Sequence, residues 1–229
     1  MRRLLAALAL TTTLTGGAAS ADTVIELYTS QGCSSCPPAD AMLAQLATRG
    51  DVIPLALHVD YWDYLGWKDD LASPAFTRRQ KGFAEAAGSA TVYTPQMVIG
   101  GVDHVIGSRP MQVMDAIQAH NAAADRVSVT LSRSGDRLQI NATGRGALPR
   151  EAVVQVVRYV PAVTRDIKRG ENAGKTITYT NTVTSWQVAG RWNPQQPLSM
   201  QAQVTGAEPV VVIIQDGTSG PILGAARLR

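Results

Sequence analysis

Short apolar runs alternate with segments of helical spacing in the first half of the chain. The apolar runs are four to eight residues long and are followed by glycine or polar residues, which is typical of strands. In the segments between them, apolar residues recur every three or four positions, as on one face of a helix. The expected strands are 24–28, 52–59, 96–99 and 102–106, and the expected helices are 38–48, 73–88 and 108–123.

Turn and capping residues support this pattern. Ser73 followed by Pro74 is a typical helix start, and Ser108 is expected to cap the last helix, with Pro110 near its beginning. Gly100-Gly101 predicts a hairpin between the last two strands. The opening strand–helix–strand unit requires a parallel pair with a right-handed crossover, and the hairpin adds an antiparallel edge. The first half is therefore predicted to form a four-stranded mixed sheet with flanking helices.

Helical periodicity largely disappears near residue 125. Seven short strand candidates follow, separated by turns rich in glycine, aspartate and serine. Such a series is typical of an antiparallel β-sandwich. We therefore predict an α/β domain over 22–124 and a β-rich, sandwich-like domain over 125–229. The strand candidates of the second domain are 127–132, 138–143, 152–160, 176–183, 198–204, 210–215 and 222–228.

The first 21 residues are typical of a secretory signal peptide. Arg2 and Arg3 precede an apolar run, and Ala19-Ser20-Ala21 supplies the small residues of a cleavage site. A membrane anchor is the alternative, but a spanning helix needs about 20 apolar residues and this run is about half as long. We expect residues 1–21 to be removed, which leaves a periplasmic or secreted protein with no membrane anchor.

Charge and composition set limits on the partners. The chain has 229 residues, 45% of them hydrophobic and 17% charged, as in ordinary globular proteins. The chain has 21 basic and 18 acidic residues, and once Arg2 and Arg3 are removed the remaining 21 − 2 = 19 basic residues nearly balance the acidic ones. A nearly neutral protein has no basic surface that would favour nucleic acid, so we expect no nucleic-acid partner.

The two cysteines of the chain, Cys33 and Cys36, are separated by two residues. An exported protein can keep disulfides, but a bridge that closes so short a loop restricts the unfolded chain very little. Redox chemistry is therefore a better reason for this pair than stability. Cys33 is expected just before a helix, where unpaired N–H groups favour a thiolate, and is predicted to be the nucleophile. Cys36, a turn inside the helix, would resolve a mixed disulfide on Cys33.

Metal binding is the alternative role for the cysteines. Zinc would need two more ligands, and the three histidines do not have matching spacing. Copper suits two thiolates and an imidazole, and His58 ends the second strand near the same edge of the sheet. Cys33, Cys36 and His58 are thus the alternative copper ligands, although we favour a redox-active disulfide without a cofactor.

The region around the cysteines resembles the glutaredoxins of the thioredoxin-like superfamily. Residues 25–29 (IELYT) and Cys33–Cys36 are similar to their active-site strand and loop, and 94–103 (TPQMVIGGVD) is similar to their second signature. The resemblance implies a thioredoxin-like fold for the first domain. It also implies that Pro95 is cis and packs against the disulfide, and that the backbone of Thr94 pairs with a substrate chain.

Further residues near the cysteines are candidates for active-site support. Tyr28 precedes the cysteine loop, Ser34 and Ser35 lie between the cysteines, and Asp103 matches a position that helps to hold glutathione. Glutaredoxins have Pro-Tyr where this chain has Ser34-Ser35. The basic residues that bind the carboxylates of glutathione have no clear equivalent in this chain, so the resemblance does not carry glutathione binding across. The full length resembles a family of exported bacterial proteins of unknown function, on residues 28–40, 58–67 and 169–174.

Two further segments carry candidate chemistry. Residues 61–67 contain four aromatic residues, which form either an exposed platform for peptides or a loop fixed onto the core. His58, Asp60 and Asp63 could form a hydrogen-bonded network near the sulfur and move a proton, or have an ordinary structural role. Arg169 and Glu171 either reach the dithiol cleft or an interdomain interface, or form an ordinary surface ion pair.

We predict an exported thiol–disulfide oxidoreductase that acts on protein or peptide thiols and exchanges electrons with an unidentified redox partner. The alternatives are a copper-binding or redox-linked carrier, and a docking protein in which the β-rich domain binds and the dithiol has little catalytic role.

Overall fold

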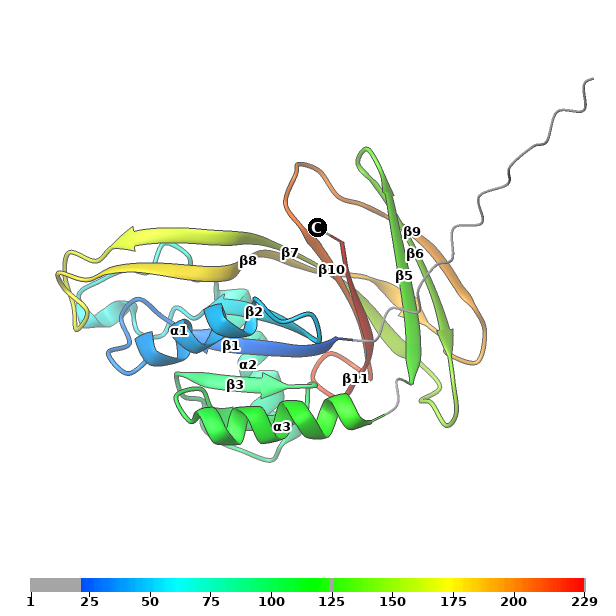
Figure 1. Cartoon of the computed structure of the whole chain (residues 1–229), viewed down its shortest axis with the longest axis horizontal. Helices are drawn as coiled ribbons and strands as arrows, with labels where there is room; N and C mark the ends of the chain where they lie inside the picture. The colour runs from blue at the N-terminus through cyan, green and yellow to red at the C-terminus, as the bar shows by residue number, and fades with distance from the viewer. Residues whose placement is uncertain (1–21, 124–125, 229) are drawn as a thin grey trace, which may run out of the picture.

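The computed structural model describes residues 22–123 and 126–228. The predicted signal segment, residues 1–21, and the predicted domain boundary at 124 and 125 lie outside the described residues. The first half has the predicted order of elements, with a short 3₁₀ helix added after the second strand (Figure 1). These elements are β1 (Thr23–Thr29), α1 (Pro37–Leu46), β2 (Val52–His58), η1 (Asp63–Leu65), α2 (Pro74–Ala86), β3 (Gln96–Ile99), β4 (Asp103–Ile106) and α3 (Pro110–Ala122).

The N-terminal caps of α2 and α3 can be compared with the two caps that the sequence predicts. The hydroxyl of Ser73 accepts a hydrogen bond from the Ala75 N–H, which confirms the predicted cap of α2. The predicted cap of α3 is wrong by one residue, because Arg109 and not Ser108 occupies the N-cap position. Pro110 lacks an N–H and has a fixed φ, so the first turn of α3 begins at this residue.

All seven strands predicted for the second half are present. Two of them are much longer than expected and form one long hairpin, whose tip lies between Asp166 and Thr176. The strands are β5 (Val127–Ser134), β6 (Arg137–Gly144), β7 (Ala152–Asp166), β8 (Thr176–Trp192), β9 (Leu198–Gln203), β10 (Val210–Gln215) and β11 (Ile222–Leu228).

The strands of both halves share one large mixed sheet. Its eight strands have the order β11-β10-β7-β8-β2-β1-β3-β4, and β5, β6 and β9 form a separate antiparallel sheet of three strands. The first half contributes the predicted mixed sheet of four strands, in which β1 pairs in parallel with β2 and antiparallel with β3. The two halves meet where β8 runs parallel to β2, with Ala56 opposite Thr182. The amide of Asn181 reinforces this junction, because it donates to the Pro54 carbonyl at 2.8 Å.

The second half forms the two expected layers of β-strands, but one of these layers is shared with the first half. Residues of β5, β6 and β9 share a hydrophobic core with residues of β7, β10 and β11. One layer of the sandwich is therefore the continuation of the sheet that begins in the first half, and the other layer is the three-stranded sheet. The sequence could not show this continuity, since each half forms plausible strand pairs by itself.

The buried side chain of Arg79 also links the two halves. Arg79 on α2 binds both carboxylate oxygens of Glu26 on β1, each at 2.6 Å. The Arg79 guanidinium lies 3.8 Å from the centre of the Trp186 ring on β8, and it donates to the Thr218 carbonyl after β10. The buried carboxylate is thus neutralised, and one arginine contacts segments from both halves.

Candidate active site

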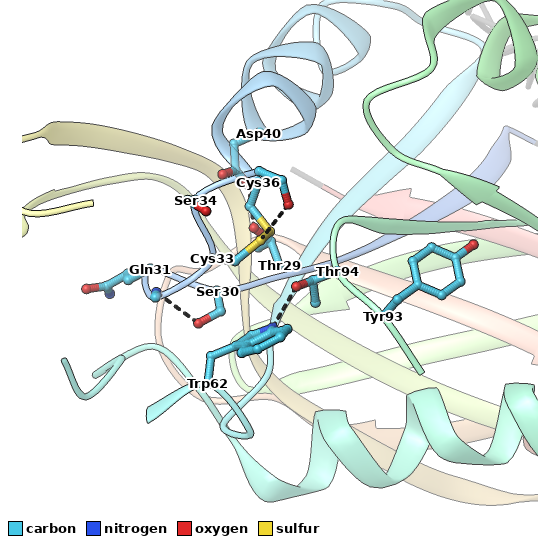
Figure 2. The surroundings of a disulfide bond; sticks show 12 residues. Thr29, Ser30, Gln31, Cys33, Ser34, Cys36, Asp40, Trp62, Tyr93 and Thr94 are labelled. Carbon is cyan, nitrogen blue, oxygen red and sulfur yellow. Dashed lines mark hydrogen bonds between the residues drawn. A yellow bond between two sulfur atoms is a disulfide. The ribbon is translucent and has the colours of Figure 1, made fainter. Parts of the chain in front are cut away.

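Cys33 and Cys36 form a disulfide at the N-terminal end of α1 (Figure 2). Both residues are buried: Cys33 is 5% exposed, and Cys36 has no exposed surface. Ser34 and Ser35 between them are exposed. Cys33 is therefore the more accessible of the two sulfur-bearing residues.

The start of α1 differs from the prediction. Cys36 does not lie a turn inside the helix but occupies its N-cap position, and the helix begins at Pro37. Pro37 and Pro38 have no N–H, so the α-helical hydrogen bonds to the carbonyls of Cys33 and Ser34 cannot form. The Cys33 carbonyl accepts from the Cys36 N–H at 3.2 Å, in a tight turn, and remains available to a further donor.

That donor comes from the tip of the β7–β8 hairpin. The side-chain amide of Asn172 donates to the carbonyl of Cys33 at 2.8 Å and to the carbonyl of Gln31 at 2.9 Å. Asn172 is 1% exposed, and its amide oxygen accepts from the Lys175 ammonium. Figure 1 shows the hairpin extending along the α1 side of the sheet. A residue of the β-rich half is therefore part of the cysteine site.

The residue before Asn172 also contacts the cysteine loop. The carboxylate of Glu171 accepts from the Ser34 N–H at 3.3 Å. This contact is at the surface, because both residues are exposed. Glu171 therefore reaches the loop between the cysteines, through the backbone of Ser34.

A buried carboxyl lies one helical turn after Cys36. Asp40 is 5% exposed, and its Oδ1 accepts from the hydroxyl of Thr29 at 2.8 Å. Its other oxygen has no hydrogen-bond partner among the described residues. Burial raises the pKa of Asp40 to about 7, although nearby His58 acts in the opposite direction. Residues four apart share a helix face, so the carboxyl is on the same face of α1 as Cys36.

His58 occupies the neighbouring position on the sheet. It is fully buried at the end of β2, opposite Thr29 in the parallel pair. Its Nδ1 lies 2.7 Å from a carboxylate oxygen of Asp69, and its ring packs edge-on against Tyr179. The Nε2 atom has no hydrogen-bond partner within the described part of the chain. Asp40 and His58 thus each keep one buried polar atom free, under the same end of α1.

Further hydrogen bonds connect this buried pair to the loop before the cysteines. The backbone N–H and side-chain amide of Gln31 both donate to Asp69 at 2.8 Å. The same amide donates to Asp70, which pairs with Arg165 on the hairpin. The Trp67 indole donates to the Gln31 side-chain oxygen. The cysteine loop is therefore held by β2, by the aromatic loop and by the hairpin together.

The segment that precedes β3 lies on the other side of the disulfide. The Thr94–Pro95 peptide bond is cis, as the resemblance implied. The hydroxyl of Thr94 accepts from the Trp62 indole at 2.7 Å, and Figure 2 shows this pair beside the cysteine loop. The aromatic loop is thus fixed onto the site through Trp62 and Trp67, while Tyr64 is 77% exposed.

Comparison with known proteins identifies the family. Residues 24–215 match the model of a family described as a protein of unknown function, DUF1223. The chain belongs to the DUF1223 family. A crystal structure of a protein from Agrobacterium tumefaciens, solved by a structural genomics consortium, is similar at 34% identity with a TM-score of 0.78. The alignment covers 91% of this chain and 94% of that chain. A comparison with curated sequences gave no match.

The structure of this DUF1223 protein brings some of the predicted residues together. Ser35 lies within 3.5 Å of the Cys33 sulfur through its hydroxyl, and Thr94 lies across from the disulfide. Tyr28 points to the other face of the sheet from Thr29, and its hydroxyl donates to Glu26. The side chain next to the site is therefore that of Thr29.

Two acidic residues named by the sequence analysis have other partners. Asp60 accepts from the Thr77 hydroxyl on α2. Asp103 pairs with His120 at 2.8 Å and lies opposite Ile99, at the turn end of β3. Pro95 precedes the opposite end of β3, so the length of this strand separates Asp103 from the disulfide.

Metal binding gains no support from these positions. Within residues 22–123 and 126–228, no three or more His, Cys, Asp or Glu side chains are arranged to hold a metal ion. The same residues contain no helix long and apolar enough to cross a membrane.

The sequence analysis missed Asp40, Asp69 and Asn172. The spacing of four residues from Cys36 to Asp40 was the one signal that could have found the buried carboxyl. No sequence pattern marks Asp69 as a site residue, because it lies in a polar loop. Asn172 was noted only as part of a surface segment, because a contact over 139 residues leaves no pattern in the sequence.

Proposed function

We propose that this DUF1223 protein is an exported thiol–disulfide oxidoreductase that acts on protein or peptide thiols. The observation that carries the proposal is the Cys33–Cys36 disulfide with the buried Asp40 carboxyl one helical turn behind it. The bridge closes a loop too short to contribute much stability. A buried carboxyl with a pKa near neutrality is also costly to maintain, and such groups gather where protons are transferred.

The reaction needs two exchange steps. In the reducing direction, the Cys33 thiolate attacks one sulfur of a substrate disulfide and releases the other as a thiol. Cys36 then attacks the Cys33 sulfur, closes the protein disulfide and releases the second substrate thiol. Two electrons pass from the dithiol to the substrate, and a dithiol or disulfide partner restores the starting state. The oxidising direction reverses these steps.

Cys33 suits the role of nucleophile. It is the more exposed cysteine and precedes the N-terminus of α1, where the helix dipole favours a negative charge, although Pro37 and Pro38 offer no N–H. Ser35 places a hydroxyl near its sulfur. A thiolate at this position would be stabilised without a basic side chain.

Asp40 suits the role of proton acceptor for Cys36. Cys36 has no access to solvent, so its thiol proton must move to a group inside the protein. Asp40 offers an oxygen without a partner among the described residues, and its pKa of about 7 leaves it partly ionised near neutral pH. His58, with its free Nε2, can stabilise the ionised carboxylate or take the proton onward.

A thioredoxin-like assignment for the first half is part of the proposal. Its support is the order β2-β1-β3-β4, the disulfide at the start of α1 and the position of Thr94 next to it. In this reading, a substrate chain pairs with the backbone at Thr94, and the loop of Trp62 and Tyr64 contacts its side chains. Export to the periplasm or medium would keep such a disulfide available.

Trapping of mixed disulfides tests this function. The C36S variant keeps the nucleophile and lacks the resolving thiol, so it should accumulate reductant-sensitive adducts with thiol proteins of a periplasmic extract. The C33S variant is the matched control and should form none, because Cys36 is inaccessible. The proposal fails if C36S forms no more adducts than C33S.

A further inference from the structure

The hairpin tip places a negative charge on the backbone of the cysteine loop. Glu171 accepts from the Ser34 N–H at 3.3 Å, and Ser34 directly follows Cys33. The hairpin belongs to the β-rich half, 137 residues later in the chain. This contact has no part in the exchange steps described above.

Asn172 fixes the position of this charge. Its amide group uses both donors on the carbonyls of Gln31 and Cys33, and its oxygen is held by Lys175. Because Asn172 is buried and fully hydrogen-bonded, the backbone next to it cannot move far from the cysteine loop. Glu171 is therefore held next to Ser34, although its own side chain is exposed.

Ser34 directly follows Cys33, so the carboxylate that binds its N–H places a negative charge close to Cys33. In the oxidised protein the Cys33 sulfur is neutral, and the N–H is satisfied by the Glu171 carboxylate. After reduction, a thiolate at Cys33 is repelled by this carboxylate. An anion at this position therefore raises the free energy of the reduced form more than that of the disulfide.

We propose that Glu171 is a positioning residue that shifts the Cys33–Cys36 couple toward the disulfide and makes the reduced protein a stronger electron donor. The inference rests on the proposed function and adds a preferred direction, the reduction of substrate disulfides. The other ionisable groups bonded around the cysteine loop are Asp40, His58, Asp69, Asp70 with Arg165, and Lys175 on Asn172. They remain unchanged when Glu171 alone is replaced.

Linkage requires a reciprocal effect on the hairpin. If Glu171 disfavours the thiolate, the thiolate weakens the bond between Glu171 and Ser34 by the same free energy. The hairpin tip, residues 167–175, should then be looser in the reduced protein than in the oxidised protein. Asn172 still contacts the loop in both states, so the tip loosens without detaching.

The reduction potential of E171Q tests the proposal. The glutamine keeps an oxygen for the Ser34 N–H and removes only the charge. Equilibration with a glutathione redox buffer should show a reduced form favoured by about two- to fivefold over wild type, as expected for a partly exposed charge at a helix N-terminus. This change corresponds to a potential higher by about 10 to 20 mV. The pKa of the Cys33 thiol should fall in the same variant.

Two comparisons separate charge from structure. D115N removes an exposed carboxylate on α3, and its potential should equal that of wild type. At 1 M salt, where the screening length is about 3 Å, the difference between E171Q and wild type should shrink. An E171Q potential that equals or falls below the wild-type value would overturn the inference. The potential is an equilibrium property of the cysteine pair, so this result leaves the trapping test of the function unaffected.

Discussion

The side-chain amide of Asn172 lies 2.8 Å from the carbonyl oxygen of Cys33, although 139 residues separate the two in the chain. The contact exists because Pro37 has no N–H to offer this carbonyl and because the long β7–β8 hairpin reaches the start of α1. The cysteine site is thus assembled from both halves of the molecule.

Replacement of Asn172 by alanine should weaken both the fold and the protection of the disulfide. The variant leaves the carbonyls of Gln31 and Cys33 without their side-chain donor, at a cost of about 2–4 kcal/mol in the free energy of unfolding. Cys33 should also become more accessible, so dithiothreitol should reduce the disulfide faster. Urea unfolding and the rate of reduction measure the two effects.

Asn181 provides the matched control. Its amide also donates to a buried carbonyl, that of Pro54, but it joins β8 to β2 away from the cysteine loop. Glycine is the suitable replacement, because Asn181 has a φ of 50°. N181G should lose stability without faster reduction. Equal reduction rates in N172A and N181G would show that Asn172 does not protect the disulfide.

The stability of the oxidised protein should depend on pH through Asp40. The pKa of this carboxyl is about 7 in the folded chain and 3.8 for an ordinary aspartate, so the folded protein binds the proton more tightly. Its contribution to stability is complete below about pH 4 and is lost as the pH rises through 7. D40N should not lose this stability. Between about pH 4 and pH 8, its free energy of unfolding should rise relative to that of wild type by on the order of 4 kcal/mol.

Denaturant titrations of both proteins across this pH range measure the effect. If the difference between D40N and wild type is the same at pH 4 and pH 8, the carboxyl does not titrate near neutrality in the folded protein.

Asp40 should also control the second exchange step. A mixed disulfide of Cys33 with 2-nitro-5-thiobenzoate releases a coloured thiolate when Cys36 attacks. The rate should rise through pH 7 in wild type, because ionised Asp40 accepts the Cys36 proton. D40N should be slower by about tenfold or more and should lose the inflection near pH 7. Stopped-flow absorbance measures this release, and an unchanged pH profile in D40N would remove Asp40 from the mechanism.

Arg79 should be essential for the junction of the two halves. R79M leaves the buried Glu26 carboxylate without its partner and removes the bond to the Thr218 carbonyl. We expect a loss of about 3–5 kcal/mol in the free energy of unfolding. R78M is the control, because Arg78 is exposed on the same helix, and its effect should stay within about 0.5 kcal/mol. Similar losses in both variants would contradict the role of the buried pair.

The elements were predictable where the local pattern is strong. Ser73-Pro74 marks the start of α2, and the apolar runs of β10 and β11 match their observed bounds. The outer parts of β7 and β8 were not predictable, because they form a half-exposed arm in which polar residues such as Thr164 and Thr178 face each other. Nor does the sequence show that β8 joins β2, since a single residue pair makes that parallel contact.

The candidate site was predictable only around its motifs. Cys33, Cys36 and Thr94 stand in local patterns that the sequence displays directly. The contacts of Asp40 and His58 depend on which faces of α1 and β2 meet, and the contact of Asn172 depends on the reach of the hairpin. These relationships are set by tertiary packing, which a local pattern does not encode.

The catalysed reduction of a fluorescence-quenched peptide disulfide by dithiothreitol tests the central claim most directly. Wild type should accelerate the reaction well beyond the rate without protein, and C33S should give no acceleration. C36S should accelerate it less than wild type, because its mixed disulfide with the peptide must wait for attack by dithiothreitol. Acceleration by C33S equal to that by wild type would contradict the assignment of Cys33 as the nucleophile. The absence of acceleration by wild type would contradict the function itself.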